Sequence, residues 1–216
     1  MSPAMTADTR ELRKRIVDTA LGMNAAGINR GKSGNVSARI DGGFLITPSG
    51  LPYADTTTDD IVAVDETGTA SGTRKPSSEW RFHLDIYRAR PQAAAIVHAH
   101  SPFATTLACL DRGIPAFHYM IAMAGGNDIR CAPYATFGTQ ELSDAALSAL
   151  DGRKACLLAH HGMIAIGETL KKALALAVEV ETLAEMYWRA LQIREPELLS
   201  DAEMQTVLAK FAHYGR

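Results

Sequence analysis

Apolar residues recur along this chain with two different periods, which together predict a mixture of helices and strands. Leu12, Ile16, Ala20 and Met23 follow the spacing of one helix face, so we expect a helix over residues 9–26 that stops at Gly27. The same kind of spacing predicts helices over residues 80–89, 102–110, 139–150, 170–193 and 200–211. The last of these opens with Ser-Asp-Ala-Glu, which has the form of a capping box.

Shorter apolar runs predict the strands. Residues 36–40 and 44–47 flank Asp41-Gly42-Gly43, a strong signal for a β-hairpin. Further strands are expected over residues 61–64, 94–100 and 155–166. Because strands and helices do not alternate strictly, we predict one α/β domain over residues 1–216, with a central, mainly antiparallel sheet flanked by helices.

Composition limits the possible functions without identifying one. The 216 residues are 47% hydrophobic and carry a net charge of −2, so the chain lacks the basic excess of nucleic-acid-binding proteins. It contains no apolar window of membrane-spanning length, and because residues 1–15 are polar and charged we expect no signal peptide. Cys109, Cys131 and Cys156 each lie beside apolar residues, so we expect buried, reduced thiols. We therefore expect a cytoplasmic protein that binds neither nucleic acid nor membrane.

Four residues are candidate metal ligands. His98 and His100 are two positions apart, so a strand would direct both imidazoles to one face. His161 ends another apolar segment, whereas its neighbour His160 would point the other way. With the carboxylate of Glu79, the three imidazoles suit a divalent, zinc-like ion, although a His-x-His pair alone is a weak signal.

Two further side chains are possible members of the same site. His83 lies one helical turn after Glu79, and we expect it to support or pack behind the ligands, with ligation as the less favoured alternative. Tyr119 lies next to an apolar run, where a tyrosine usually belongs to the core. It would act as a general acid or base only if it reached the metal.

Three short stretches of small hydrogen-bonding residues predict an anion site. Glycines allow backbone N–H groups to approach a phosphate closely, and hydroxyl and amide groups add donors. Ser77 or Ser78 would also cap the helix over residues 80–89, whose N-terminus favours an anion. Each stretch alone is typical of a turn or cap, but together they predict a phosphate pocket beside Glu79. Its residues are Gly34, Asn35, Ser49, Gly50, Ser77 and Ser78.

These segments resemble the class II aldolase/adducin family, and the similarity covers nearly the whole chain. It rests on residues 34–37, 45–50, 76–83, 97–100, 114–121, 132–139, 160–162 and 211–215. The resemblance implies the class II aldolase fold and one Zn²⁺ per subunit on His98, His100 and His161, with Glu79 as a fourth ligand that is freed as acid/base when substrate arrives. It also implies the phosphate site.

The resemblance further implies a cyclic homotetramer with sites between subunits. Tyr119 and Tyr214 would then be catalytic residues that reach the metal of the neighbouring subunit. Phe137 and Phe211 would form an apolar wall against the aldehyde end of the substrate. Lys32 departs from the family, which usually has a threonine there; it either adds a cation to the phosphate site or points to solvent.

The implied reaction is reversible cleavage of a phosphorylated sugar, a 1-phosphoketose, into dihydroxyacetone phosphate and a short aldehyde. The resemblance is nearest to the branch that cleaves L-fuculose 1-phosphate to L-lactaldehyde, which we take as the expected substrate. Cleavage of 5-deoxyribulose 1-phosphate or 5-methylthioribulose 1-phosphate is the alternative, since the apolar wall would accept either. A sugar-phosphate 4-epimerase and a non-catalytic adducin-like interaction domain are further alternatives. The complete set of four ligands argues against the last.

Overall fold

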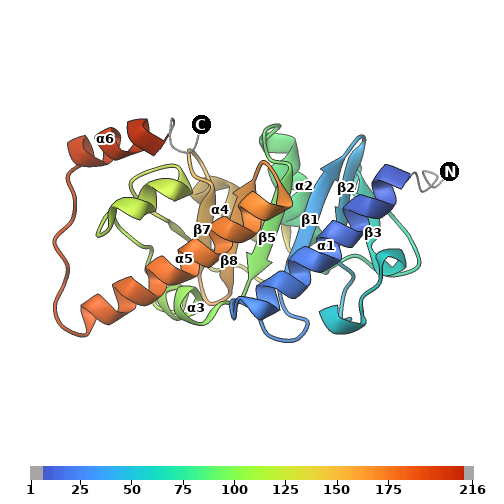
Figure 1. Ribbon diagram of the computed structural model, residues 1–216, viewed down its shortest axis with the longest axis horizontal. Helices are drawn as coiled ribbons and strands as arrows, with labels where there is room; N and C mark the ends of the chain where they lie inside the picture. The colour runs from blue at the N-terminus through green and yellow to red at the C-terminus, as the bar shows by residue number, and fades with distance from the viewer. Residues whose placement is uncertain (1–6, 212–216) are drawn as a thin grey trace.

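A sheet of eight strands forms the middle layer of the structure, a computed structural model that describes residues 7–211 (Figure 1). The strand order is β4-β3-β2-β1-β5-β8-β7-β6, and every adjacent pair is antiparallel except β6 and β7. The predicted mainly antiparallel sheet is therefore confirmed. The strands are β1 (Asn35–Ile40), β2 (Gly43–Ile46), β3 (Val62–Asp65), β4 (Ala70–Ser71), β5 (Ala95–Ala99), β6 (Cys131–Ala132), β7 (Ala155–Leu158) and β8 (Gly162–Gly167).

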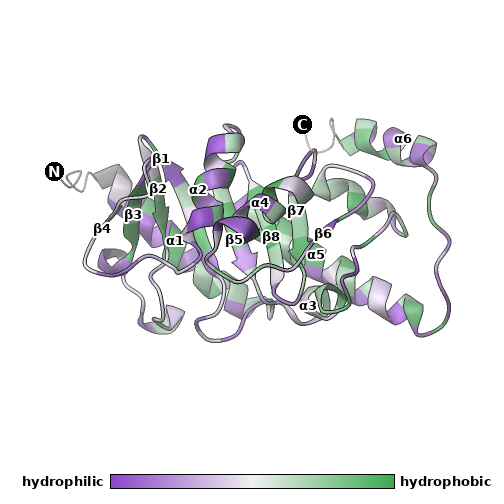
Figure 2. Cartoon of the chain, turned by 180° about the vertical axis from the view of Figure 1, so that it is seen from behind, coloured by the Kyte–Doolittle hydropathy of each residue, from purple (hydrophilic) through white to green (hydrophobic). Residues whose placement is uncertain are grey.

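Helices cover both faces of this sheet. In Figure 1, α1 and α5 lie side by side in front of the sheet; Figure 2 shows α2 and α4 on the opposite face. No helix in the described part of the chain is both long enough and apolar enough to cross a membrane. The α-helices are α1 (Ala7–Ala25), α2 (Trp80–Ala89), α3 (Pro102–Ala108), α4 (Gln140–Ala149), α5 (Leu170–Leu191) and α6 (Asp201–Phe211), and three 3₁₀ turns are η1 (Tyr53–Asp55), η2 (Thr58–Asp60) and η3 (Tyr119–Ala124).

The alternation of side chains along β5 separates the core from the site. Ala95, Val97 and Ala99 belong to the apolar cluster beneath α1 and α5. Ile96 belongs to the cluster beneath α2 and α4. Because successive strand residues point to opposite faces, His98 lies on the α2 side. The face beneath α2 therefore carries polar side chains as well as a core.

The predicted strand over residues 155–166 is wrong, because the structure forms a hairpin there. β7 ends at Leu158, β8 begins at Gly162, and the two strands pair antiparallel. His160 makes the turn in a left-handed conformation (φ +53°), and its backbone N–H donates to the carbonyl of Ala108. The sequence carries no sign of this turn, because residues 155–159 are all apolar and lead directly into the two histidines.

The expectation of three buried thiols is also wrong in part. Cys156 is buried in β7, but Cys131 is half-buried and Cys109 is exposed. Cys109 follows the last residue of α3 and Cys131 begins an edge strand. Apolar neighbours in the sequence do not bury a residue at the end of an element, because the chain turns there.

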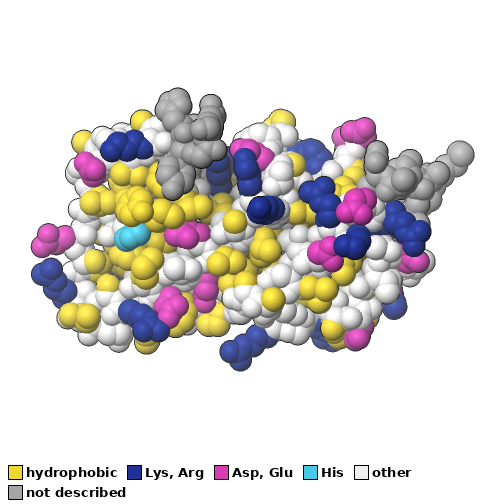
Figure 3. All heavy atoms as spheres, in the orientation of Figure 1, with side chains coloured by type: hydrophobic (Ala, Val, Ile, Leu, Met, Phe, Trp, Pro, Cys, Tyr) yellow, Lys and Arg dark blue, Asp and Glu magenta, His cyan; other side chains and the backbone are white. Residues whose placement is uncertain are grey.

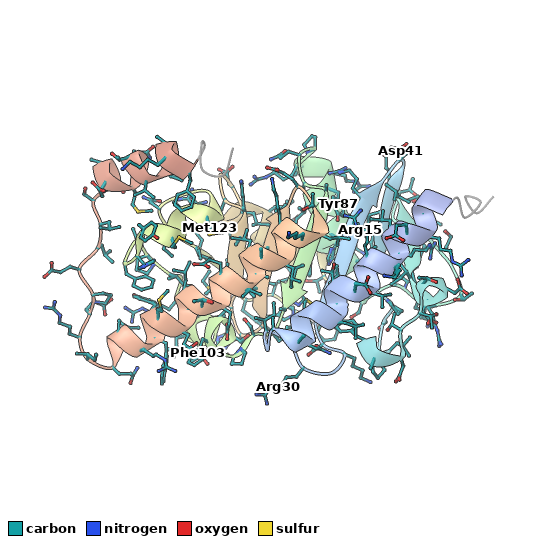
Figure 4. All side chains as sticks on the ribbon, viewed as in Figure 1. Arg15, Arg30, Asp41, Tyr87, Phe103 and Met123 are labelled. Atoms are coloured by element: carbon teal, nitrogen blue, oxygen red, sulfur yellow. The ribbon has the colours of Figure 1, made fainter. Side chains whose placement is uncertain are left out.

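Helix α3 is capped by a residue from another helix. Ser101, at its N-cap position, makes no capping hydrogen bond with its side chain. Instead, the Glu181 carboxylate of α5 accepts hydrogen bonds from the backbone N–H groups of Phe103 (2.8 Å) and Ala104 (2.9 Å). Figure 4 shows Phe103 beside the C-terminal half of α5. The two N–H groups are otherwise unpartnered at a helix start, so this contact joins α3 to α5.

We expect Glu181→Ala to lower the free energy of unfolding by about 2 kcal/mol, since it removes charge-assisted hydrogen bonds from two backbone donors. Glu185→Ala is the matched control on the same helix: its exposed pair with Arg189 is worth less than about 0.5 kcal/mol. Urea unfolding of both variants at equal protein concentration measures the difference. Equal losses in the two variants would refute the capping role.

Candidate metal and substrate site

Glu79, His98, His100 and His161 converge at one point, with one ligand atom of each within 4.8 Å of the others. The Nε2 atoms of His98 and His100 are 3.0 Å apart. Glu79 Oε2 lies 3.1 Å from His98 Nε2, and Glu79 Oε1 lies 2.9 Å from His161 Nε2. The structure thus brings together all four residues that the sequence analysis singled out as metal ligands.

Three neighbouring elements deliver these side chains. His98 lies on β5 and His100 follows its end, while His161 ends the β7–β8 turn beside β5. Glu79 is the N-cap residue of α2. Gly162 permits this close arrangement, because a Cβ there would lie 2.5 Å from the Ala99 carbonyl oxygen and 2.9 Å from His100 Cδ2.

The tautomer of His98 suits a metal ligand. Its Nδ1 atom lies 2.8 Å from the carbonyl oxygen of Met163. A carbonyl only accepts hydrogen bonds, so Nδ1 carries the hydrogen and the lone pair of the neutral ring is on Nε2, which faces the cluster. Such a hydrogen bond to the remote nitrogen is typical of metal-binding histidines.

The charges of the site are coupled. Burial alone would raise the pKa of Glu79, but the fields of His98 and His161 and their contacts hold it well below its usual range. Partial burial and the neighbouring imidazoles lower the pKa of His100 to about 4. An ionised carboxylate and a neutral imidazole are the forms in which these groups bind metal.

The donor set fits a divalent cation. Glu79 is 7% exposed, and its Oε1 atom is buried without a hydrogen bond, although His161 Nε2 is close. A buried carboxylate oxygen in this state is costly unless a cation neutralises it. A tetrahedral zinc ion with bonds of about 2.0–2.1 Å holds its ligand atoms roughly 3.3 Å apart. Three of the atom pairs here are separated by 2.9, 3.0 and 3.1 Å.

A cavity of about 350 Å³ opens beside these ligands. All three predicted phosphate stretches line it, as do Phe137 and Lys32. Tyr134 and His160 also line it, and sequence reasoning missed both as site residues. Gly138 allows the loop that carries Tyr134 and Phe137 to pack close to Ser78, since a Cβ at Gly138 would lie 2.9 Å from the Ser78 carbonyl oxygen. A larger hollow of about 650 Å³ lies between α5, α6 and η3, but none of the four metal ligands lines it.

Asn35 is already engaged within the protein. Its Nδ2 donates to Ser77 Oγ (3.0 Å) and to Glu79 Oε2 (2.9 Å), which accounts for both amide hydrogens. The predicted capping of α2 by Ser77 or Ser78 is wrong, because α2 has no side-chain cap at its N-cap residue. The Ser77 hydroxyl accepts from Asn35 instead, with a longer contact from the Glu79 N–H (3.3 Å).

Two of the predicted aromatic residues lie away from the cavity of their own chain. Tyr119 is half exposed on η3, and its ring stacks on that of Phe211 with centroids 6.4 Å apart. Phe211 lines the larger hollow, and neither ring lines the cavity at the metal ligands. Tyr214 lies outside the described residues. Of the two residues predicted to form the apolar wall, only Phe137 lines the cavity of its own chain.

Comparison with known proteins gives a consistent set of relatives. The family described as "Class II Aldolase and Adducin N-terminal domain" matches residues 14–188. A 5-methylthioribulose-1-phosphate/5-deoxyribulose-1-phosphate aldolase of Rhodospirillum rubrum is 62% identical, over 94% of this chain and 92% of its own. The L-fuculose phosphate aldolase of Escherichia coli K12 is 52% identical, over 96% and 97%. Among solved structures, an L-fuculose 1-phosphate aldolase matches with a TM-score of 0.92 and 39% identity, covering 98% of this chain and 100% of that one.

These relatives correct the expected substrate. We expected L-fuculose 1-phosphate, but the relative named for the five-carbon substrates is more similar than the fuculose relative, at 62% against 52%. Most segments behind the expectation carry the metal ligands and the small residues of the cavity, and the metal-ligand residues would suit either sugar. The residues expected at the aldehyde end, Phe137 and Phe211, would accept either sugar, so they did not separate the two substrates.

We expect His161→Ala to reduce bound divalent metal to well below one ion per chain, because it removes one of four converging candidate ligands. His160→Ala is the matched control: this neighbouring histidine lines the cavity but is not part of the cluster. Elemental analysis after dialysis against a weak chelator measures both. Metal loss in His160→Ala with retention in His161→Ala would reverse the assignment.

Proposed function

Because this chain belongs to the class II aldolase and adducin family, we propose that it cleaves 5-methylthioribulose 1-phosphate and 5-deoxyribulose 1-phosphate. The products are dihydroxyacetone phosphate and a short aldehyde. The substrate proposal rests on the 62% identity with the Rhodospirillum rubrum aldolase that is named for these two sugars. The four converging ligands beside a cavity lined by hydroxyl and glycine residues support the reaction class.

Cleavage of the C3–C4 bond leaves an electron pair on C3, which the adjacent C2 carbonyl accepts as an enediolate. We propose that Glu79, His98, His100 and His161 hold Zn²⁺, which suits three nitrogen ligands and one oxygen. A divalent cation there would supply Lewis-acid stabilisation of the developing negative charge. This chemistry requires no lysine Schiff base.

The phosphate end would lie against the small residues of the cavity. Ser77 and Ser78 precede α2, so their hydroxyl groups and the N-terminal backbone N–H groups of that helix favour an anion. Gly34, Ser49 and Gly50 allow close backbone approach. Asn35 would have to release one of its present acceptors to join them. The remaining cavity extends toward Phe137, whose apolar ring suits a methyl or methylthio end.

Two proton transfers complete the reaction. We assign to Glu79 the proton that reaches C3 of the enediolate, because its carboxylate lies at the metal cluster. The proton of the C4 hydroxyl needs a second base, for which Tyr119 of a neighbouring copy is our candidate, supported by Tyr214. The side chain of Tyr119 would meet the cavity only across a subunit boundary, since Tyr119 does not line the cavity of its own chain.

A homotetramer with sites between subunits would supply these residues. Tyr119 stacks on Phe211, so one neighbour would bring a tyrosine and the second half of the apolar wall together. Figure 3 supports a contact surface, because apolar side chains gather over η3 and the adjoining part of α5. We therefore propose that Phe211 faces the Phe137 of the adjacent subunit.

A coupled assay for dihydroxyacetone phosphate tests the substrate. We expect kcat/KM to be about tenfold or more higher for 5-methylthioribulose 1-phosphate and 5-deoxyribulose 1-phosphate than for L-fuculose 1-phosphate, because a pocket discriminates on this scale through small apolar contacts. A strong chelator should abolish all three activities and added Zn²⁺ should restore them. Preference for L-fuculose 1-phosphate would contradict the proposed substrate, and full activity with chelator would contradict the metal.

Glu79→Gln tests the acid/base role. The amide cannot exchange a proton with C3, so we expect kcat to fall by about 10²–10⁴ while the three imidazoles retain metal. The melting temperature and the bound zinc serve as controls for folding and for the site. Near-normal turnover in this variant would refute the role of Glu79.

A further inference from the structure

A chain of buried hydrogen bonds leads from Glu79 into the interior beneath α2. Glu79 Oε2 accepts from Asn35 Nδ2 (2.9 Å), and Asn35 Oδ1 lies 2.5 Å from His83 Nε2. His83 Nδ1 lies 2.7 Å from Ser37 Oγ, which lies 2.8 Å from the hydroxyl of Tyr87. The four residues behind Glu79 are all buried, from 0% to 4% exposed. The proposed reaction uses none of the last three.

Strand β1 and helix α2 each present two polar side chains to the other, because the spacing of these residues follows the period of the strand and of the helix. Asn35 and Ser37 are two residues apart on β1, so both point to the α2 face of the sheet. His83 and Tyr87 are four residues apart on α2, so both face the strand. Figure 4 labels Tyr87 close to β1. The hydrogen-bond chain thus follows from the packing of one helix against one strand.

The donor of each hydrogen bond between Glu79 and Tyr87 can be assigned. The Glu79 carboxylate only accepts, so the Asn35 atom beside it is the amide nitrogen, and Oδ1 faces His83. Oδ1 only accepts, so His83 carries its hydrogen on Nε2. Full burial lowers the pKa of His83 to about 3, which leaves Nδ1 as an acceptor for the Ser37 hydroxyl. The Ser37 oxygen then accepts from Tyr87.

We propose that His83 is a positioning residue, which holds the Asn35 amide in one orientation and thereby aims the Glu79 carboxylate at the metal cluster. Ser37 and Tyr87 select the His83 tautomer that makes this possible. The consequence for turnover rests on the proposed aldolase function, whereas the tautomer and the orientation of Glu79 do not. Supporting residues behind metal ligands typically change metal affinity or activity by about 10–100-fold when removed.

Two substitutions at position 83 separate this role from packing. His83→Phe keeps an aromatic ring next to Phe82 and Phe44, whose ring centroids lie 4.6 and 6.3 Å from that of His83. It leaves Asn35 Oδ1 without its donor, so the amide is held only through the hydrogen bonds of Nδ2. His83→Gln restores an N–H near the former Nε2 position. Tyr87→Phe removes one oxygen at the far end and tests the same chain where His83→Phe fails to fold.

The first readout is the visible spectrum of the Co²⁺-substituted protein, which reports the ligands directly. We expect His83→Phe to shift the cobalt bands and to lower kcat by about 10–100-fold with a smaller change in KM, and His83→Gln to recover toward wild type. Tyr87→Phe should shift the bands in the same direction to a smaller extent. Tyr187→Phe is the control, since it removes a buried hydroxyl bound by Arg112 instead. An unshifted spectrum in His83→Phe, or equal shifts in Tyr87→Phe and Tyr187→Phe, would overturn the proposal.

The second readout needs no substrate. In the zinc-loaded protein with ¹⁵N-labelled histidine, we expect His83 to show a protonated Nε2 and a bare Nδ1. A hydrogen on Nδ1 would overturn the proposal even if the enzyme cleaves its substrate. If the cobalt and NMR results hold while no 1-phosphoketose is cleaved, the proposed function fails and the positioning role of His83 remains.

Discussion

The pairing of β5 with β1 on one side and β8 on the other is the constraint on which the site depends. Its register places Asn35 opposite His98, and it sets Ala99 opposite Met163 at the turn that carries His161. Backbone hydrogen bonds thus fix the imidazoles relative to one another before any ion is bound. A slip of one residue would turn His98 to the opposite face, beneath α1 and α5.

The two faces of the sheet differ in the polarity of their buried side chains. Beneath α1 and α5, β5 contributes only apolar side chains. Beneath α2, buried polar residues stand among apolar ones: Asn35, Ser37, His83 and His98. Such groups destabilise a core unless each finds a partner, and here each has one. The outcome is a rigid support behind Glu79 rather than a purely apolar layer.

Different parts of the site would contact the two ends of the proposed substrate. The four candidate metal ligands and the small-residue loops come from one chain, and in the proposed reaction they would face the part of the substrate that the two sugars share. The far end would meet Phe137 and Tyr134, which line the same cavity and are largely exposed in the single chain. Similar motifs therefore specify a similar reaction, while substrate choice depends on fewer and more exposed positions. Such a division would account for an error in the expected sugar alongside a correct assignment to the class II aldolases.

The sequence by itself determined the elements and the chemical types. Helical and strand periods located α2 and the β1–β2 hairpin. The residue types also marked His98, His100, His161 and Glu79 as candidate metal ligands. These signals depend on backbone geometry and side-chain chemistry within short segments. Only the tertiary structure decided that residues 155–166 form a hairpin, that Cys109 is exposed, and that Asn35 joins His83 to Glu79. Those features depend on contacts between residues more than 40 positions apart or on where the chain turns. Local periodicity carries no information about either.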